Sequence, residues 1–203
     1  MSASPRLIIG VGGTLREGST SQKALRIALD AAEEFGAATR IFAGPAINLS
    51  PYDPADPRRS SEAAALVDSL RAADGVIVAS PSYHGSISGM LKNALDYTED
   101  LRTDPRCYLS GRAVGLIVCA DGVQAMGSTL ATLRSIAHAL RGWPTPFAAV
   151  INSALQPFAA DGSCRIADVE EQLRRVAEQV VDMAVMQRRK STEPHAPGLL
   201  QPA

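Results

Sequence analysis

The sequence contains few aromatic residues and carries no strong charge of either sign. Its 203 residues include only 4 Phe, 4 Tyr and 1 Trp, so aliphatic residues and alanine must fill the core. The 20 Lys and Arg residues against 21 Asp and Glu residues leave a formal net charge of −1. Such a chain has no field that attracts nucleic acid or an anionic membrane, and we expect neither as a partner.

Cysteine is also scarce. The chain has no C-x-x-C pair and no histidine at zinc-ligand spacing from Cys107, Cys119 or Cys164. We therefore expect no metal site and a reduced, cytoplasmic chain. The first apolar run, at residues 7–11, is too short for a signal sequence or a membrane span.

Short apolar runs alternate with segments of helical periodicity. The runs predict strands at residues 39–42, 7–11, 75–79, 113–119 and 147–151. They are nearly continuous, which is typical of parallel strands covered on both faces. Apolar residues at helical spacing predict helices at 21–35, 62–73, 88–97, 127–140 and 166–183. Five such alternations predict an α/β fold, a doubly wound five-stranded parallel sheet with helices on both faces.

The length and pattern indicate one domain. The chain has no internal repeat, so we expect a single domain over residues 1–187. Residues 188–203 are polar and contain proline, which predicts a flexible tail. Residues 45–59 are rich in Pro and Asp and predict a surface loop.

The loop after the first predicted strand has the composition of a phosphate site. In sheets of this kind, ligands bind beyond the carboxyl ends of the strands. Glycines in this loop let successive backbone N–H groups point inward, and the following helix N-terminus adds a partial positive charge. We expect hydroxyl donors around one cationic side chain, provided by Thr14, Ser19, Thr20, Ser21 and Arg16.

The spacing within this loop excludes two common phosphate motifs. Leu15 stands where a dinucleotide fingerprint needs its third glycine, and Ser19 stands where a Walker A loop has its lysine. ATP hydrolysis is therefore not expected, and one terminal phosphate monoester fits best. Helix capping alone would account for the serines, but it leaves Arg16 and the glycines unexplained.

Two further loops follow the third and fourth predicted strands. Residues 80–96 expose backbone amides beside Tyr83 and His84, a surface suited to the edge of a flat heterocycle. Residues 120–127 are again small and polar and contain glycine. We expect all three loops to converge on one crevice.

In these loops the sequence resembles the NADPH-dependent FMN reductases, a family of flavodoxin-like fold. Their phosphate loop, G-S-x-R-x-x-S, is matched by residues 13–19, with Thr14 in place of the usual serine. Their second signature, P-x-Y-N/H-x-S-x-P/S-G-x-L-K-N-x-x-D, is matched by residues 81–96, with His84 where many members carry asparagine. The second match is long and specific.

The resemblance implies a flavodoxin-like, FMN-binding reductase domain that uses FMN and NADPH. It implies that the FMN phosphate is held by Thr14, Arg16, Ser19, Thr20 and Ser21. It implies that the isoalloxazine ring is lined by Pro81, Ser82, Tyr83, His84, Gly85 and Ser86. The other edge of the ring would be approached by Asp121, Gly122, Val123 and Gln124.

These observations favour an NAD(P)H-dependent FMN oxidoreductase, in which hydride passes from nicotinamide to flavin and on to a second acceptor. Such a transfer needs neither a nucleophile nor a metal, so no residue is assigned as catalytic. The acceptor is a small molecule such as free flavin, a quinone, an azo compound or oxygen, and free flavin would serve a flavin-dependent monooxygenase. Alanine-rich helices and the resemblance favour a homodimer or homotetramer.

Two other classes of protein stay open. A flavodoxin-like electron carrier would bind FMN without turning over NADPH, but such carriers are usually strongly acidic and enclose the flavin between aromatic rings. The near-neutral charge and the few aromatics disfavour it. A flavin-binding sensor or interaction module would bind FMN without steady oxidation of NADPH.

Overall fold

The centre of the computed structural model, which describes residues 4–192, is a parallel sheet. Its strands lie in the order β2-β1-β3-β5, with β6 and β7 both beside β5. Their bounds are β1 (Arg6–Gly12), β2 (Ala37–Ala43), β3 (Gly75–Tyr83), β5 (Ala113–Ala120), β6 (Trp143–Pro144) and β7 (Ala149–Asn152). A short strand, β4 (Ser86–Ile87), pairs antiparallel with the end of β3.

The fifth strand is interrupted. We predicted one strand at residues 147–151, whereas β6 pairs with the start of β5 and β7 with its end. Pro144 and Pro146 lie at the break, and a proline has no N–H to donate to the neighbouring strand. The two pieces together complete the predicted five-stranded sheet.

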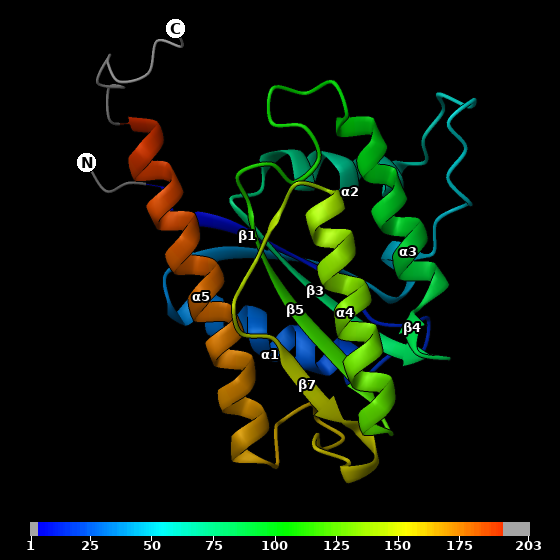
Figure 1. Ribbon diagram of the computed structural model, residues 1–203, viewed down its shortest axis with the longest axis vertical. Coiled ribbons are helices and arrows are strands. Elements are labelled where there is room, and N and C mark those ends of the chain that lie inside the picture. Colours follow the sequence, from blue (N-terminus) through cyan, green and yellow to red (C-terminus); the bar gives the residue numbers. More distant parts are fainter. Residues whose placement is uncertain (1–3, 193–203) are drawn as a thin grey trace, which may run out of the picture.

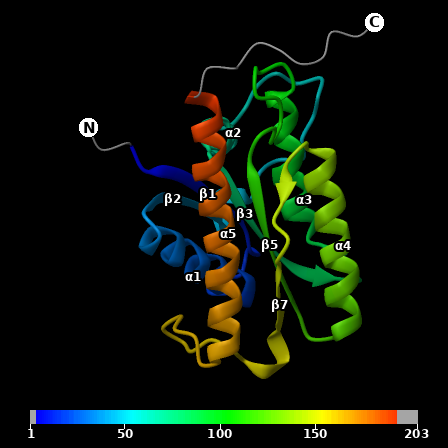
Figure 2. The same cartoon turned by 60° about the vertical axis from the view of Figure 1, so that its left-hand side comes forward.

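Helices cover both faces of the sheet, as predicted (Figures 1 and 2). On one face lie α1 (Thr20–Glu34) and α5 (Ala167–Thr192), and on the other α2 (Ser61–Ala72), α3 (Gly89–Asp96) and α4 (Val123–Ala139). Short 3-10 turns complete the chain: η1 (Gly44–Ile47), η2 (Tyr97–Leu101) and η3 (Ser153–Leu155). The last helix continues through Thr192, past the tail boundary expected at 187, and residues 193–203 lie outside the described residues. No helix of residues 4–192 is both long and apolar enough to cross a membrane.

Side-chain alternation along the strands builds two separate cores. Ile8 and Ile77 pack with α1 and α5, while their neighbours Ile9 and Val76 pack with the helices of the other face. Gly115 lets α5 approach closely, because a Cβ there would lie 2.6 Å from Val176 Cγ1. Strands buried on both faces are nearly all apolar, which is why the runs were visible in the sequence.

The loop expected at residues 45–59 is firmly anchored. Arg59 donates to both carboxylate oxygens of Asp100, at 2.7 and 2.8 Å, and its guanidinium stacks on the rings of Tyr52 and Tyr97. Asn93 on α3 accepts a 2.8 Å hydrogen bond from the Tyr52 amide. These contacts hold the loop against α3, and none of residues 45–59 is among those that line the cavity of the candidate site.

Candidate functional site

The loop between β1 and α1 begins with two glycines that the packing requires. The Gly13 amide donates a 3.1 Å hydrogen bond to the carbonyl oxygen of Ala79, and Gly13 has a φ of +93°. Gly12 lies so close to β3 that no side chain fits there. The chain then turns into α1, whose N-terminus faces the carboxyl edge of the sheet.

A cavity of about 190 Å³ lies at this edge, where the loops after β1, β3 and β5 come together. Its walls include these residues expected from the sequence: Thr14, Arg16, Ser19, Thr20, Ser21, Pro81, Ser82, Tyr83 and Asp121. Ala120, the first residue of the expected 120–127 loop, also lines the cavity, as do Cys119 and Ser153, which sequence reasoning missed. Ser153 follows the fifth strand, so the rule used for the other loops would have found it.

The other expected residues lie beside the cavity rather than in its wall. His84 and Gly85 form the two-residue turn of the β3–β4 hairpin, with φ values of +51° and +78° and Ser86 after them. Gly122 caps α4, and Val123 and Gln124 begin the helix. Contacts from these six residues to a ligand stay predictions.

The hydroxyl groups at the start of α1 have different partners. Ser19 caps the helix by accepting a 3.3 Å hydrogen bond from the Gln22 amide, which leaves its own proton free to donate. The Thr14 hydroxyl accepts a 3.1 Å bond from the Arg16 amide. The Ser21 hydroxyl is buried and has no partner among the described residues. Capping therefore explains Ser19 but leaves Ser21 without a structural role.

Positive charge is available at the same place. The Arg16 side chain is exposed and forms no hydrogen bond or ion pair with any residue in the range 4–187. The partial positive charge of the α1 N-terminus adds to it. A buried hydroxyl without a partner, an unpaired guanidinium and a helix N-terminus together suit an anion of the size of a phosphate.

Cys119 is no nucleophile in this cavity. Burial raises the pKa of its thiol to about 12, so the thiol stays protonated and neutral at physiological pH. Among the described residues, no group of three or more His, Cys, Asp or Glu side chains is placed to hold a metal ion. The residues of the cavity therefore favour binding and orientation of a cofactor over covalent chemistry.

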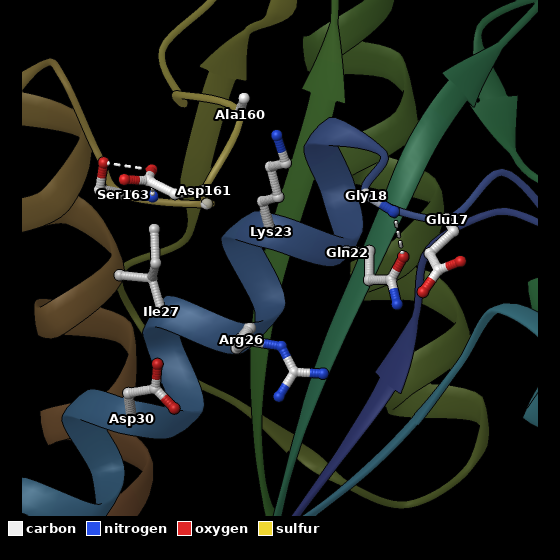
Figure 3. Close-up of a pocket in the computed structure, with 11 residues that line it drawn as sticks. Glu17, Gly18, Gln22, Lys23, Arg26, Ile27, Asp30, Ala160, Asp161 and Ser163 are labelled. Carbon is white, nitrogen blue, oxygen red and sulfur yellow. Dashed lines mark hydrogen bonds between the residues drawn. The ribbon is translucent and has the colours of Figure 1, made fainter.

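A second hollow of about 450 Å³ lies on the outer face of α1, next to the 160–163 loop (Figure 3). Figure 3 shows Lys23 extended toward Ala160 and Arg26 directed away from that loop, and the Lys23 ammonium donates a 2.7 Å bond to the Ala159 carbonyl. Its lining carboxylates are those of Glu17, Asp30 and Asp161. The side chains of Lys23 and Arg26 face three carboxylates, which leaves no excess positive charge, so this hollow suits an anion less well than the smaller cavity does.

Large apolar side chains are exposed on or beside the segments that line the smaller cavity. Leu15, Tyr83, Val123 and Leu155 are 58%, 51%, 78% and 64% exposed. Tyr83 lines the cavity, and each of the other three lies within two residues of a lining residue. We call these four residues the apolar rim. Exposed apolar side chains near a cavity are typical of a surface that binds a ligand or a partner.

The strand order, the helices on both faces and the cavity at the carboxyl edge define a flavodoxin-like protein. Solved structures agree. FerB from Paracoccus denitrificans, described as a flavoenzyme NAD(P)H:(acceptor) oxidoreductase, superposes with a TM-score of 0.72 at 23% identity, over 90% of this chain and 98% of that one. A flavodoxin from Streptococcus pneumonia gives a TM-score of 0.58 at 14% identity, over 87% of this chain and 98% of the other.

The chain belongs to the NADPH-dependent FMN reductase family, whose family model matches residues 7–156. It is 38% identical over 109 residues to an FMN-dependent NADPH-azoreductase of Staphylococcus aureus. That alignment covers 54% of this chain and 54% of the azoreductase, so the chain spans about half the length of this relative. The resemblance of the two signature loops is thereby confirmed as family membership.

Proposed function

We propose that the chain binds FMN at the carboxyl edge of the sheet and transfers hydride from NADPH to it, as an NAD(P)H-dependent FMN oxidoreductase. The observation that carries this proposal is the buried Ser21 hydroxyl, which has no partner among the described residues and lies in the cavity wall beside Arg16. A phosphate oxygen supplies the missing partner.

The size of the cavity indicates which part of FMN it encloses. A volume of about 190 Å³ is below the roughly 300–1,000 Å³ of pockets that surround a whole ligand. The phosphate end would fit within the walls, and Tyr83 and Asp121 would border the isoalloxazine ring.

In this function the chain binds and orients, while FMN supplies a ring that accepts hydride and later releases two electrons. The α1 N-terminus and Arg16 hold the phosphate. Backbone amides of residues 82–86 would donate to the ring and stabilise the negative charge of its reduced form. Cys119 stays a neutral thiol in the wall and takes no part in the transfer.

The electron acceptor we propose is a small molecule: free flavin, a quinone or an azo compound. The azo compound has further support, because the relatives are named azoreductases. If free flavin is the acceptor, a flavin-dependent monooxygenase is the partner that consumes it. The cytoplasm, which supplies NADPH, is the compartment we propose.

A second copy of the chain covers the apolar rim in this proposal, as a homodimer or homotetramer. Water-exposed Val123 and Leu155 favour burial against another apolar surface. The Leu155→Glu variant should shift the protein toward the monomer in light-scattering measurements. An unchanged molar mass for this variant would remove the rim from the interface.

FMN binding is tested by titrating the FMN-free protein with FMN and following flavin fluorescence. Arg16→Ala should raise the Kd of FMN by roughly tenfold or more, because a charge-assisted bond to the phosphate is lost. Arg26→Ala is the matched control, since Arg26 lies on α1 but lines only the second hollow. Equal FMN affinity of wild type and Arg16→Ala would contradict the assignment.

A further inference from the structure

Helix α4 engages the hydroxyl of Ser82, a residue expected to line the flavin ring. The Ser82 oxygen lies 2.6 Å from Thr129 Oγ1 and 3.2 Å from the carbonyl oxygen of Ala125. A serine hydroxyl has one proton and a carbonyl can only accept, so Ser82 donates to Ala125 and Thr129 donates to Ser82. Thr129 is 0% exposed, so its hydroxyl has no access to water, and Ser82 is its hydrogen-bond partner.

These two bonds join the loops expected to face opposite edges of the isoalloxazine ring. Ser82 belongs to the 81–86 loop, and Ala125 directly follows the 121–124 loop in the first turn of α4. The turn of the β3–β4 hairpin also packs against α4, because a Cβ at Gly85 would lie 3.2 Å from Ser128 Oγ. Contacts with α4 therefore fix the distance between the 81–86 segment and the 121–124 segment.

The same segment is held from its other side by Ser80. The buried Ser80 hydroxyl donates a 2.7 Å bond to the Pro81 carbonyl and accepts a 3.2 Å bond from the amide of Ser88, which caps α3. The segment is thus tied to α3 through Ser80 and to α4 through Ser82. The Ser82 hydroxyl holds the backbone of this segment in place, and it does not itself bind a ligand.

We infer that Thr129 is a positioning residue for the flavin site: through its bond to Ser82 it holds the 81–86 and 121–124 loops at the separation that the ring requires. The inference rests on the proposed FMN function. Loops that are already ordered bind with less loss of entropy, so the Thr129 hydroxyl raises FMN affinity. Fixed amide donors also stabilise reduced flavin, so the hydroxyl raises the midpoint potential of the bound FMN.

Three variants test this role. Thr129→Val keeps the shape of the side chain and removes the hydroxyl, whereas Thr129→Ser keeps the hydroxyl. Thr132→Val is the matched control on the same helix, because the Thr132 hydroxyl donates a 3.0 Å bond to the Ser128 carbonyl within α4. The measurements are the Kd of FMN by fluorescence titration and the midpoint potential of the bound FMN.

We expect Thr129→Val to raise the Kd about fivefold, the effect of one lost hydrogen bond, and to make the midpoint potential more negative. Thr129→Ser and Thr132→Val should stay close to wild type. Ser82→Ala removes the other end of the bond and should give the same changes as Thr129→Val, which provides the test if Thr129→Val does not fold.

Each contrary result has a distinct meaning. Wild-type affinity and potential in both Thr129→Val and Ser82→Ala would overturn the positioning role and leave the proposed function intact. Equal changes in Thr129→Val and Thr132→Val would also overturn it, because they would reflect a weakened helix. A wild-type protein that does not bind FMN would overturn both the inference and the proposed function.

Discussion

A Cβ atom on residue 12 would lie 2.0 Å from the carbonyl oxygen of Ala79, so Gly12 is in direct backbone contact with the neighbouring strand. The same carbonyl accepts the hydrogen bond from the Gly13 amide. The ends of β1 and β3 are thereby held together where the wall of the cavity begins. The loop that carries Thr14 and Arg16 begins at this contact.

Replacing Gly12 by alanine should therefore destabilise the protein. The backbone of β3 has to move, and we expect Gly12→Ala to lower the free energy of unfolding by about 2–4 kcal/mol. Gly127→Ala on α4 is the control, since nothing lies within 4 Å of a Cβ there, and it should raise that free energy by about 0.5–1 kcal/mol. Urea unfolding measures both. A Gly12→Ala variant as stable as wild type would disprove the close contact.

Ser21→Ala should change stability and FMN affinity in opposite directions. In the FMN-free protein the change removes a buried hydroxyl without a partner, so the melting temperature should stay the same or rise. In the presence of FMN the variant lacks one donor to the phosphate, and the Kd should increase by about fivefold. Calorimetry with and without FMN gives both numbers. A lower melting temperature without FMN would show that Ser21 has a structural partner.

The cysteines should react with iodoacetamide at very different pH values. Ser110 and the Arg141 guanidinium, which donates a 2.9 Å bond to the sulfur, lower the pKa of the Cys107 thiol. Because the thiolate is the reactive form, alkylation of Cys107 should begin at a lower pH than for an ordinary thiol. Burial raises the pKa of Cys119 to about 12, so this residue should stay unmodified in the folded protein at pH 8.

Peptide mass spectrometry across a pH series follows each cysteine separately. Arg141→Asn removes the cation at a position with a φ of +60°, which asparagine tolerates, and should move the Cys107 profile to higher pH. An unshifted Cys107 profile in this variant would exclude the guanidinium as the cause.

Much of this fold could be predicted because the strands are buried on both faces and therefore appear as apolar runs. The break between β6 and β7 could not, because the prolines there act through hydrogen bonds that only the pairing with β5 defines. The extension of α5 through Thr192 could not be predicted, because the composition of that segment is polar.

The residues of the candidate site could be predicted where one loop contains the functional side chains together, as in residues 13–21. Contacts between segments that lie far apart in the sequence could not be predicted. Thr129 lies 47 residues from Ser82, and nothing in either local sequence predicts their bond. Arg141 lies 34 residues from Cys107, so the sequence showed no group that activates this thiol.

Hydride transfer from NADPH to bound FMN is best tested by adding NADPH to the FMN-loaded protein without oxygen and recording the visible spectrum. We expect the yellow colour of bound FMN to bleach at once and to return when oxygen or a quinone is admitted. Bound FMN that is bleached by dithionite but unchanged by NADPH would rule out the reductase function and identify an electron carrier or a flavin-binding module instead.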